Sequence, residues 1–171
     1  MPQIGVVLGS DSDLPKIVSG IELMNKFGLE YEIRIISAHR TPTEALNYAQ
    51  SAKERGLQVI ISVAGMAAHL GGVLAASTTL PVIGVPIASG AFSGIDAVYA
   101  NLQMPPGVPV AVVGVDNMKN AVLLAAQIIA LSDKNIAKKV EDFRGQQREE
   151  VIRKDEKLQQ DGYRHYLQNN S

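Results

Sequence analysis

Two side chains that can do chemistry stand next to each other in residues 37–42, which read Ser-Ala-His-Arg-Thr-Pro. His39 can take up or release a proton near neutral pH, and Arg40 is a permanent cation that can donate paired hydrogen bonds to phosphate. The segment follows a strand-like apolar run over residues 31–36, and Pro42 suits the first turn of a helix. Such a loop lies at the carboxyl end of a strand, where open α/β sheets bind ligands. The pair therefore suits an anionic substrate, although a lone His-Arg pair can also be a polar loop without function.

A second loop, residues 9–13, reads Gly-Ser-Asp-Ser-Asp and also lies between an apolar run and a predicted helix. The hydroxyls of Ser10 and Ser12, together with the first N–H groups of the helix, form an expected anion site. Ser and Asp before a helix are also common N-caps, so we expect capping from at least one of them. Because carboxylates repel phosphate, Asp11 or Asp13 must point away or bind sugar hydroxyls. The spacing is neither a P-loop nor a dinucleotide fingerprint, which favours a mononucleotide-sized ligand without a triphosphate.

A third loop, residues 64–72, follows the apolar run 57–63 and contains His69. Small residues such as Gly65 let the backbone come close to a flat ligand. A lone histidine of this kind is more often structural than catalytic. The third histidine, His165, lies in the tail, and no histidine pair has metal-ligand spacing. We therefore expect no metal site.

Alternating apolar runs and helical patterns predict one α/β domain over residues 1–131, with a parallel, doubly wound sheet. The predicted strands cover 3–8, 30–36, 57–63, 80–87 and 109–115, and the predicted helices cover 14–27, 42–55, 73–77, 94–102 and 117–131. The last helix is so apolar that we expect it under the sheet or against another subunit.

From residue 132 the chain becomes highly charged, with a thin apolar stripe and a bend predicted at Gly145. We interpret residues 132–171 as a C-terminal helical extension and not an independent domain. It either packs along its own domain or rests on a neighbouring subunit, and the sequence leaves both possibilities open.

The composition narrows the classes of function. A net charge of −1 and a pI near 6.3 leave no basic surface for nucleic acid or membrane, so no such partner is expected. The absence of cysteine excludes disulfides and thiolate chemistry and favours a cytoplasmic location. The start of the chain does not resemble a signal peptide, and no run reaches the ~18 apolar residues of a membrane span.

The loops and their neighbours resemble the PurE family of purine biosynthesis, in register from about residue 3 to 131. That resemblance implies a flavodoxin-like three-layer α/β/α sandwich with a parallel sheet, assembled as a homo-octamer with sites at subunit boundaries, and no cofactor. The strings that carry it are Gly-Ser-Asp-Ser-Asp at 9–13, Ser-Ala-His-Arg-Thr-Pro at 37–42, Ala-Ala-His-Leu at 67–70, Leu-Pro-Val-Ile-Gly-Val-Pro at 80–86 and Gln-Met-Pro-Pro-Gly-Val-Pro at 103–109.

The resemblance also implies roles, with a small phosphoribosyl aminoimidazole as the substrate. His39 would be the acid–base residue, His69 would line a carbon dioxide pocket, and Asp13 would bind the ribose hydroxyls. The implied substrate-binding residues are Ser10, Ser12, Asp13, Ser37, Ala38, Arg40, Gly65, Ala67, Ala68 and Leu70.

Two branches of the family differ in reaction. Bacterial mutases interconvert N5-carboxyaminoimidazole ribonucleotide and 4-carboxy-5-aminoimidazole ribonucleotide, whereas animal-type relatives carboxylate aminoimidazole ribonucleotide directly. Arg40 and the string at 67–70 resemble the mutases, although Met66 and Gly71 stand where many mutases have Gly and Pro.

Two other classes remain as alternatives. A non-catalytic nucleotide sensor on the same fold is disfavoured by His39. A flavin-binding relative is disfavoured by the absence of Trp and the few aromatic residues.

Overall fold

A five-stranded parallel sheet, in the order β2-β1-β3-β4-β5, organises the protein. The computed structural model describes residues 1–169. The strands are β1 (Ile4–Leu8), β2 (Tyr31–Ile35), β3 (Val59–Gly65), β4 (Val82–Ile87) and β5 (Ala111–Val112). The helices are the short 3₁₀ turn η1 (Asp11–Asp13), α1 (Leu14–Phe27), α2 (Pro42–Ala52), α3 (Leu70–Ala76), α4 (Ile95–Leu102), α5 (Met118–Ala130) and α6 (Lys134–Asn169). This strand order is that of flavodoxin-like folds.

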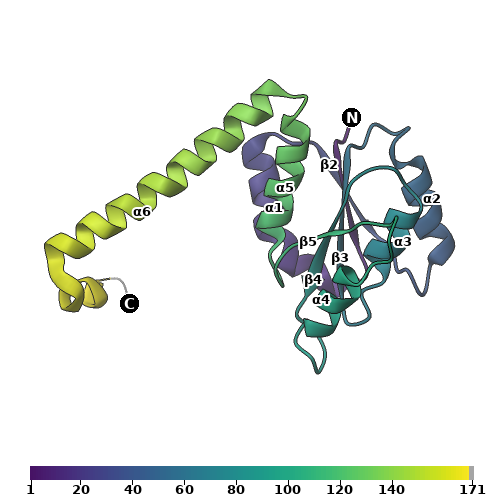
Figure 1. Ribbon diagram of the computed structural model, residues 1–171, viewed down its shortest axis with the longest axis horizontal. Coiled ribbons are helices and arrows are strands. Elements are labelled where there is room, and N and C mark those ends of the chain that lie inside the picture. Colours follow the sequence, from purple (N-terminus) through teal and green to yellow (C-terminus); the bar gives the residue numbers. More distant parts are fainter. Residues whose placement is uncertain (170–171) are drawn as a thin grey trace.

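Helices cover both faces of the sheet. Helices α1 and α5 pack on one face, and α2, α3 and α4 pack on the other (Figure 1). Strands β1 and β4 are buried along their whole length, and β3 is buried up to its last residue, as expected for continuous apolar runs in a parallel sheet. The predicted three-layer α/β/α class is confirmed.

Local sequence signals place the two helices on the first face. Gly28 ends α1 in the left-handed conformation, with φ of 63°, and its N–H donates to Asn25 O. The side chain of Asn117 caps α5 by accepting from the N–H of Asn120. Gly20 of α1 lies directly against Met118, where a Cβ would collide with that side chain. Close packing therefore buries one face of α5 under its own sheet, which is one of the two positions expected for it.

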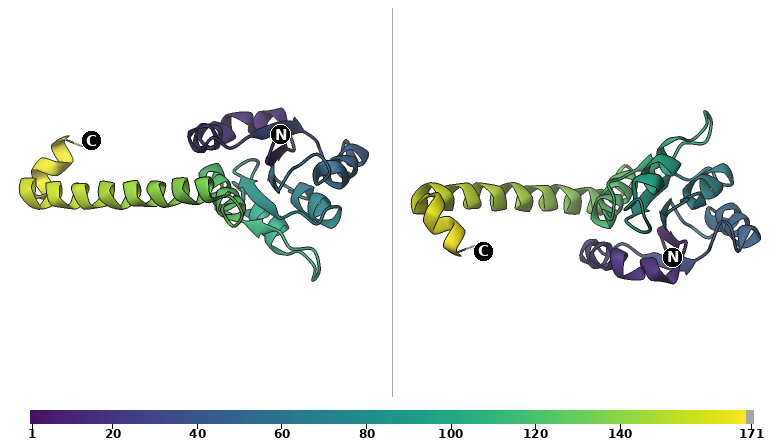
Figure 2. Two further views of the ribbon diagram at one scale, coloured as in Figure 1. Left: turned by 90° about the horizontal axis from the view of Figure 1, so that it is seen from above. Right: turned by 90° about the horizontal axis from the view of Figure 1, so that it is seen from below.

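Helix α6 begins on the domain and then leaves it (Figures 1 and 2). Ile136 and Val140 are buried in the core, and the Phe143 ring packs edge-on against Phe27 with centroids 5.6 Å apart. Beyond this contact most side chains are exposed. The bend predicted at Gly145 is wrong, because the helix runs through that residue and breaks at Gly162, where φ is 70°.

Several predicted element ends are also wrong. The fifth strand is two residues long instead of seven, α2 ends at Ala52 instead of residue 55, and α3 begins three residues early, at Leu70. The chain after β5 still follows the edge of β4, since the N–H of Val113 donates to Gly84 O and that of Asp116 to Pro86 O. None of the helices within residues 1–169 combines the length and apolarity needed to cross a bilayer.

Candidate functional site

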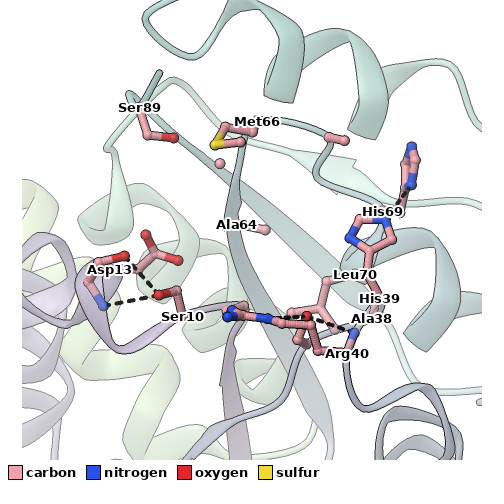
Figure 3. A pocket seen from close by; sticks show the side chains of 15 residues that line it. Ser10, Asp13, Ala38, His39, Arg40, Ala64, Met66, His69, Leu70 and Ser89 are labelled. Carbon is pink, nitrogen blue, oxygen red and sulfur yellow. Dashed lines mark hydrogen bonds between the residues drawn. The ribbon is translucent and has the colours of Figure 1, made fainter. Parts of the chain in front are cut away.

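A pocket of about 450 Å³ opens at the carboxyl ends of β1 to β4 (Figure 3). All strand pairs are parallel, so the loops that follow these strands emerge at one edge of the sheet. The pocket lies where the chain order reverses between β1 and β3, the position at which folds of this class bind ligands. Its lining residues are Gly9, Ser10, Ser12, Asp13, Ser37, Ala38, His39, Arg40, Ala64, Gly65, Met66, Ala67, His69, Leu70 and Ser89.

The loop after β1 supplies hydroxyl groups. Ser12 Oγ donates to Ser10 Oγ at 2.9 Å, and Ser10 Oγ accepts the N–H of Ser12 at 3.3 Å. The N–H of Asp13 donates to Ser10 O. The short turn η1 precedes α1, and the N–H groups of Ser12 and Asp13 bond within this turn. The expected anion site at the helix N-terminus stays a prediction. Ser10 and Ser12 line the pocket, and Ser10 caps η1 by accepting from the N–H of Ser12, which confirms the predicted cap.

The two carboxylates of this loop point in different directions. Asp11 is exposed and accepts from Ser10 Oγ and from the N–H of Ser12, so it faces its own turn. Asp13 is only 7% exposed and lines the pocket. Burial raises the pKa of the Asp13 carboxyl, although hydrogen bonds at Ser10 and Ser12 oppose the shift and the charges of Asp11 and Asp116 add to it. The Asp11 carboxylate thus turns away from the pocket, whereas the Asp13 carboxylate faces it, where it could accept from sugar hydroxyls.

The loop after β2 places Arg40 beside the serines. Its backbone N–H donates to Ser37 Oγ at 3.2 Å, which fixes the turn before α2. Its guanidinium makes two long contacts, 3.4 Å from Nη2 to Gly9 O and 3.5 Å from Nε to Ser37 Oγ. Both contacts are weak at these distances, so most of the five guanidinium donors remain available for an anion. Together with the Ser10 and Ser12 hydroxyls, Arg40 forms the cationic and hydroxyl-rich side of the pocket.

The two histidines form a pair. His39 from the loop after β2 and His69 at the start of α3 approach to 2.9 Å between Nε2 and Nδ1, with their rings at 73°. One of these two nitrogens carries the hydrogen of this bond, and the tautomers of the rings decide which one donates. Both rings line the pocket and lie on the opposite side from Ser10 (Figure 3).

The loops after β3 and β4 form the remaining wall. Gly65 lies so close to Ser89 Oγ that a Cβ would collide with it. Met66 is exposed and has φ of 54°, an unusual conformation for a residue other than glycine. Ala68 does not line the pocket, because its side chain is buried in the core below the loop.

The sequence reasoning missed four lining residues: Gly9, Ala64, Met66 and Ser89. Ser89 comes two residues after the end of β4, so the rule that ligands bind at carboxyl ends of strands could have identified it. The left-handed backbone of Met66 gave no signal in the sequence. Every other residue predicted for the site lines the pocket.

The arrangement suits acid–base chemistry on a small anionic ligand. A cation with hydroxyls stands on one side, and an imidazole pair stands on the other. Among residues 1–169 no group of three or more His, Cys, Asp or Glu could hold a metal ion. Fold and site together define a flavodoxin-like α/β protein with a pocket at the carboxyl edge of its sheet, lined by Arg40, serine hydroxyls and an imidazole pair.

The chain belongs to the AIR carboxylase family, whose sequence model matches residues 3–150. It is 48% identical over 167 residues to the N5-carboxyaminoimidazole ribonucleotide mutase of Thermotoga maritima, covering 98% of both chains. It is 46% identical to the phosphoribosylaminoimidazole carboxylase of Saccharomyces cerevisiae, covering 98% of this chain and 29% of that longer protein. The crystal structure of Treponema denticola PurE superposes with a TM-score of 0.83 at 33% identity, covering 92% of this chain and 99% of that one.

Proposed function

We propose that this protein is an N5-carboxyaminoimidazole ribonucleotide mutase of de novo purine biosynthesis, which moves a carboxyl group from the exocyclic nitrogen to ring carbon 4. The observation that carries the proposal is the division of one pocket into a phosphate side and a proton-transfer side. Arg40 and the hydroxyls of Ser10 and Ser12 stand on the first, and the His39–His69 pair stands on the second. Relatives that match along their whole length, such as that of Thermotoga maritima, carry this name.

The binding roles follow from chemistry. Arg40 and the Ser10, Ser12 and Ser37 hydroxyls hold the ribose phosphate, because donors and a cation match its oxygens. Asp13 accepts hydrogen bonds from the ribose hydroxyls. With the phosphate and the sugar fixed there, the aminoimidazole ring extends toward His39 and the loop that contains Gly65 and Ala67.

The reaction needs one proton to change place. The bond between nitrogen and the carboxyl carbon breaks, carbon dioxide leaves, and the nitrogen takes up a proton. Carbon 4 then attacks the retained carbon dioxide and loses its own proton. His39 serves both steps, giving a proton to nitrogen and taking one from carbon 4, so the overall reaction is an isomerisation without ATP or an added cofactor. General acid–base catalysis of this kind contributes about 10²–10⁴ in rate.

The test of the proposal is conversion of one carboxylated ribonucleotide into the other by purified protein without ATP. His39→Asn should abolish turnover while retaining ribonucleotide binding, because an amide cannot carry the proton. Wild-type protein that binds the ribonucleotide without converting it would favour the nucleotide-sensor alternative. Normal turnover by His39→Asn would assign the proton transfer to another group.

Direct carboxylation of aminoimidazole ribonucleotide is the second candidate, since the related proteins of Saccharomyces cerevisiae and Vigna aconitifolia are named carboxylases. Both are far longer than this chain, which spans 29% and 30% of them. Arg40, in the position where direct carboxylases usually carry Lys, favours the mutase. Aminoimidazole ribonucleotide with bicarbonate, compared with the N-carboxylated ribonucleotide at equal concentration, decides between the two reactions.

We also propose that copies of this chain assemble, as an octamer by resemblance to the family. Helix α4 exposes an apolar row of Ile95, Tyr99 and Leu102, each more than half exposed, and Phe92 continues the row. A second copy is the occupant that fits, because this helix follows the loop of Ser89 and a neighbour seated there would border the pocket. Sedimentation velocity should show an octamer for wild type and Tyr99→Phe, and smaller species for Tyr99→Glu. A monomeric wild type would contradict the proposal.

A cytoplasmic location is part of the same proposal, since the pathway uses phosphorylated intermediates that do not cross membranes unaided. Cell fractionation tests this location. Recovery of the protein in a membrane or secreted fraction would contradict it.

A further inference from the structure

Asp116 lies outside the pocket but bonds to two elements that form its walls. It follows β5, and its N–H donates to Pro86 O at 2.9 Å. One carboxylate oxygen, Oδ1, accepts from the N–H of Ala88 at 3.0 Å. The other, Oδ2, accepts from Lys16 Nζ at 2.6 Å. The carboxylate therefore continues the hydrogen bonding along the edge of β4 beyond the end of the regular strand.

These bonds join opposite sides of the pocket. Ala88 precedes Ser89, which lines the pocket against Gly65 and Met66. Lys16 belongs to the first turn of α1, three residues after Asp13 on the phosphate side. A single carboxylate thus connects the base of the phosphate side with the wall after β4.

Within one chain, few hydrogen bonds other than this one hold the wall after β4. Ser89, Gly90 and Ala91 lie outside the ladder of β4, residues 90–94 form a turn, and the next well-formed backbone bond in the chain is from the N–H of Ile95 to Phe92 O. Gly90 and Gly94 have positive φ, which is typical of a turning segment without regular structure. The bond to Ala88 is therefore the last fixed point before Ser89.

We propose that Asp116 is a positioning residue for the mutase reaction: by holding Ala88, it keeps Ser89 seated against Gly65 and closes the wall that retains carbon dioxide. This inference rests on the proposed function, since it assigns the wall a role in that reaction. Asp116 does not line the pocket, so it acts through the backbone of Ala88. Loss of its bond opens the wall, and carbon dioxide escapes before carbon 4 captures it.

The backbone conformation of Asp116 permits two substitutions, one that keeps the acceptor oxygen and one that removes it. Its φ of 56° is a conformation that Asn and Gly adopt more readily than other residues. Asp116→Asn keeps an oxygen for the N–H of Ala88, whereas Asp116→Gly removes the acceptor without backbone strain. Asp142→Ala is the matched control, because it removes the acid of an exposed Lys–Asp pair on α6, far from the pocket.

Two measurements test the proposal. The first is the fraction of N-carboxylated substrate that ends as aminoimidazole ribonucleotide and free carbon dioxide. The second is hydrogen exchange of the amides of residues 88–90 in substrate-free protein, followed by mass spectrometry. Asp116→Gly should raise both the released fraction and the exchange rate by about tenfold, the effect of losing one hydrogen bond to a charged group. Asp116→Asn and Asp142→Ala should stay close to wild type.

An Asp116→Gly variant with the same exchange rate and the same released fraction as wild type would overturn the proposal. Equal defects in Asp116→Asn and Asp116→Gly would also overturn it, because the retained oxygen would then not hold Ala88. The exchange measurement needs no substrate, so it tests the bond even if wild type lacks mutase activity. Failure of the proposed function and failure of this inference are therefore distinguishable.

Discussion

Replacing Arg40 with Ala should weaken binding of the phosphorylated ligand while leaving the fold intact. The guanidinium makes only two long contacts within the protein, to Gly9 O and Ser37 Oγ. The side chain is exposed, so its removal creates no buried cavity. We therefore expect the melting temperature of Arg40→Ala to match that of wild type, which makes any loss of affinity a loss of ligand contacts.

The size of the loss follows from the donors that remain available. One hydrogen bond between a guanidinium and a phosphate oxygen contributes about 1.5–3 kcal/mol. Since every ~1.4 kcal/mol changes affinity tenfold, losing one bond weakens binding by roughly 10- to 150-fold. A forked pair of bonds places the loss toward the upper end. Arg40→Lys keeps the charge without the fork and should fall between wild type and Arg40→Ala.

Isothermal titration calorimetry with two ligands tests this reasoning. Aminoimidazole ribonucleotide carries the phosphate, and the corresponding nucleoside lacks it. If Arg40 binds the phosphate, the substitution weakens the ribonucleotide and leaves the nucleoside unchanged. Ribonucleotide affinity within about threefold of wild type, or an equal loss for both ligands, would refute the assignment, since either result places the phosphate elsewhere.

Three further predictions concern other parts of the molecule. Burial raises the pKa of Asp13, so the folded state binds the carboxyl proton more tightly than the unfolded chain does. The free energy of unfolding therefore falls as pH rises through the folded pKa of this carboxyl. Asp13→Asn should therefore melt at a higher temperature than wild type at pH 7 but not at pH 3, and should bind the ribonucleotide more weakly, as calorimetry would measure. His69→Asn should lower kcat by at least about tenfold with little change in KM, because His39 loses the imidazole to which it is hydrogen-bonded at 2.9 Å. Ending the chain after Gly145 should keep the packing of Phe143 on Phe27 and lower the melting temperature little, while reducing assembly seen by sedimentation.

The location of the site was predictable because it depends on topology. Apolar runs with helical segments between them require parallel strands, and parallel strands bring their carboxyl ends to one edge. His39 and His69 are thirty residues apart in sequence, yet they meet at 2.9 Å because β2 and β3 both flank β1. The sequence contained this information without indicating that the two rings would touch.

Details that depend on packing were not predictable. Ala68 stands in the same small-residue string as Ala67, but the turn after β3 directs one side chain into the core and the other to the pocket. A glycine at 145 costs a helix only about 1 kcal/mol, so it does not by itself end one. The fifth strand is short because its regular pairing with β4 spans only Ala111 and Val112, after which Asp116 continues the contact through its side chain.

The phosphate side of the pocket and the wall beside Gly65 and Ser89 come from different pairs of loops, although His39 shares its loop with Arg40. Ser10 and Arg40 follow β1 and β2, whereas Gly65 and Ser89 follow β3 and β4. Under the proposed function, substrate affinity and the fate of carbon dioxide should therefore depend on different segments. Arg40→Ala should weaken substrate binding without changing the fraction of carbon dioxide released. Asp116→Gly should raise the released fraction without changing substrate affinity. If both variants changed both the affinity and the released fraction, the pocket would act as one unit. Separate segments for phosphate binding and for carboxyl transfer would then not describe how it works.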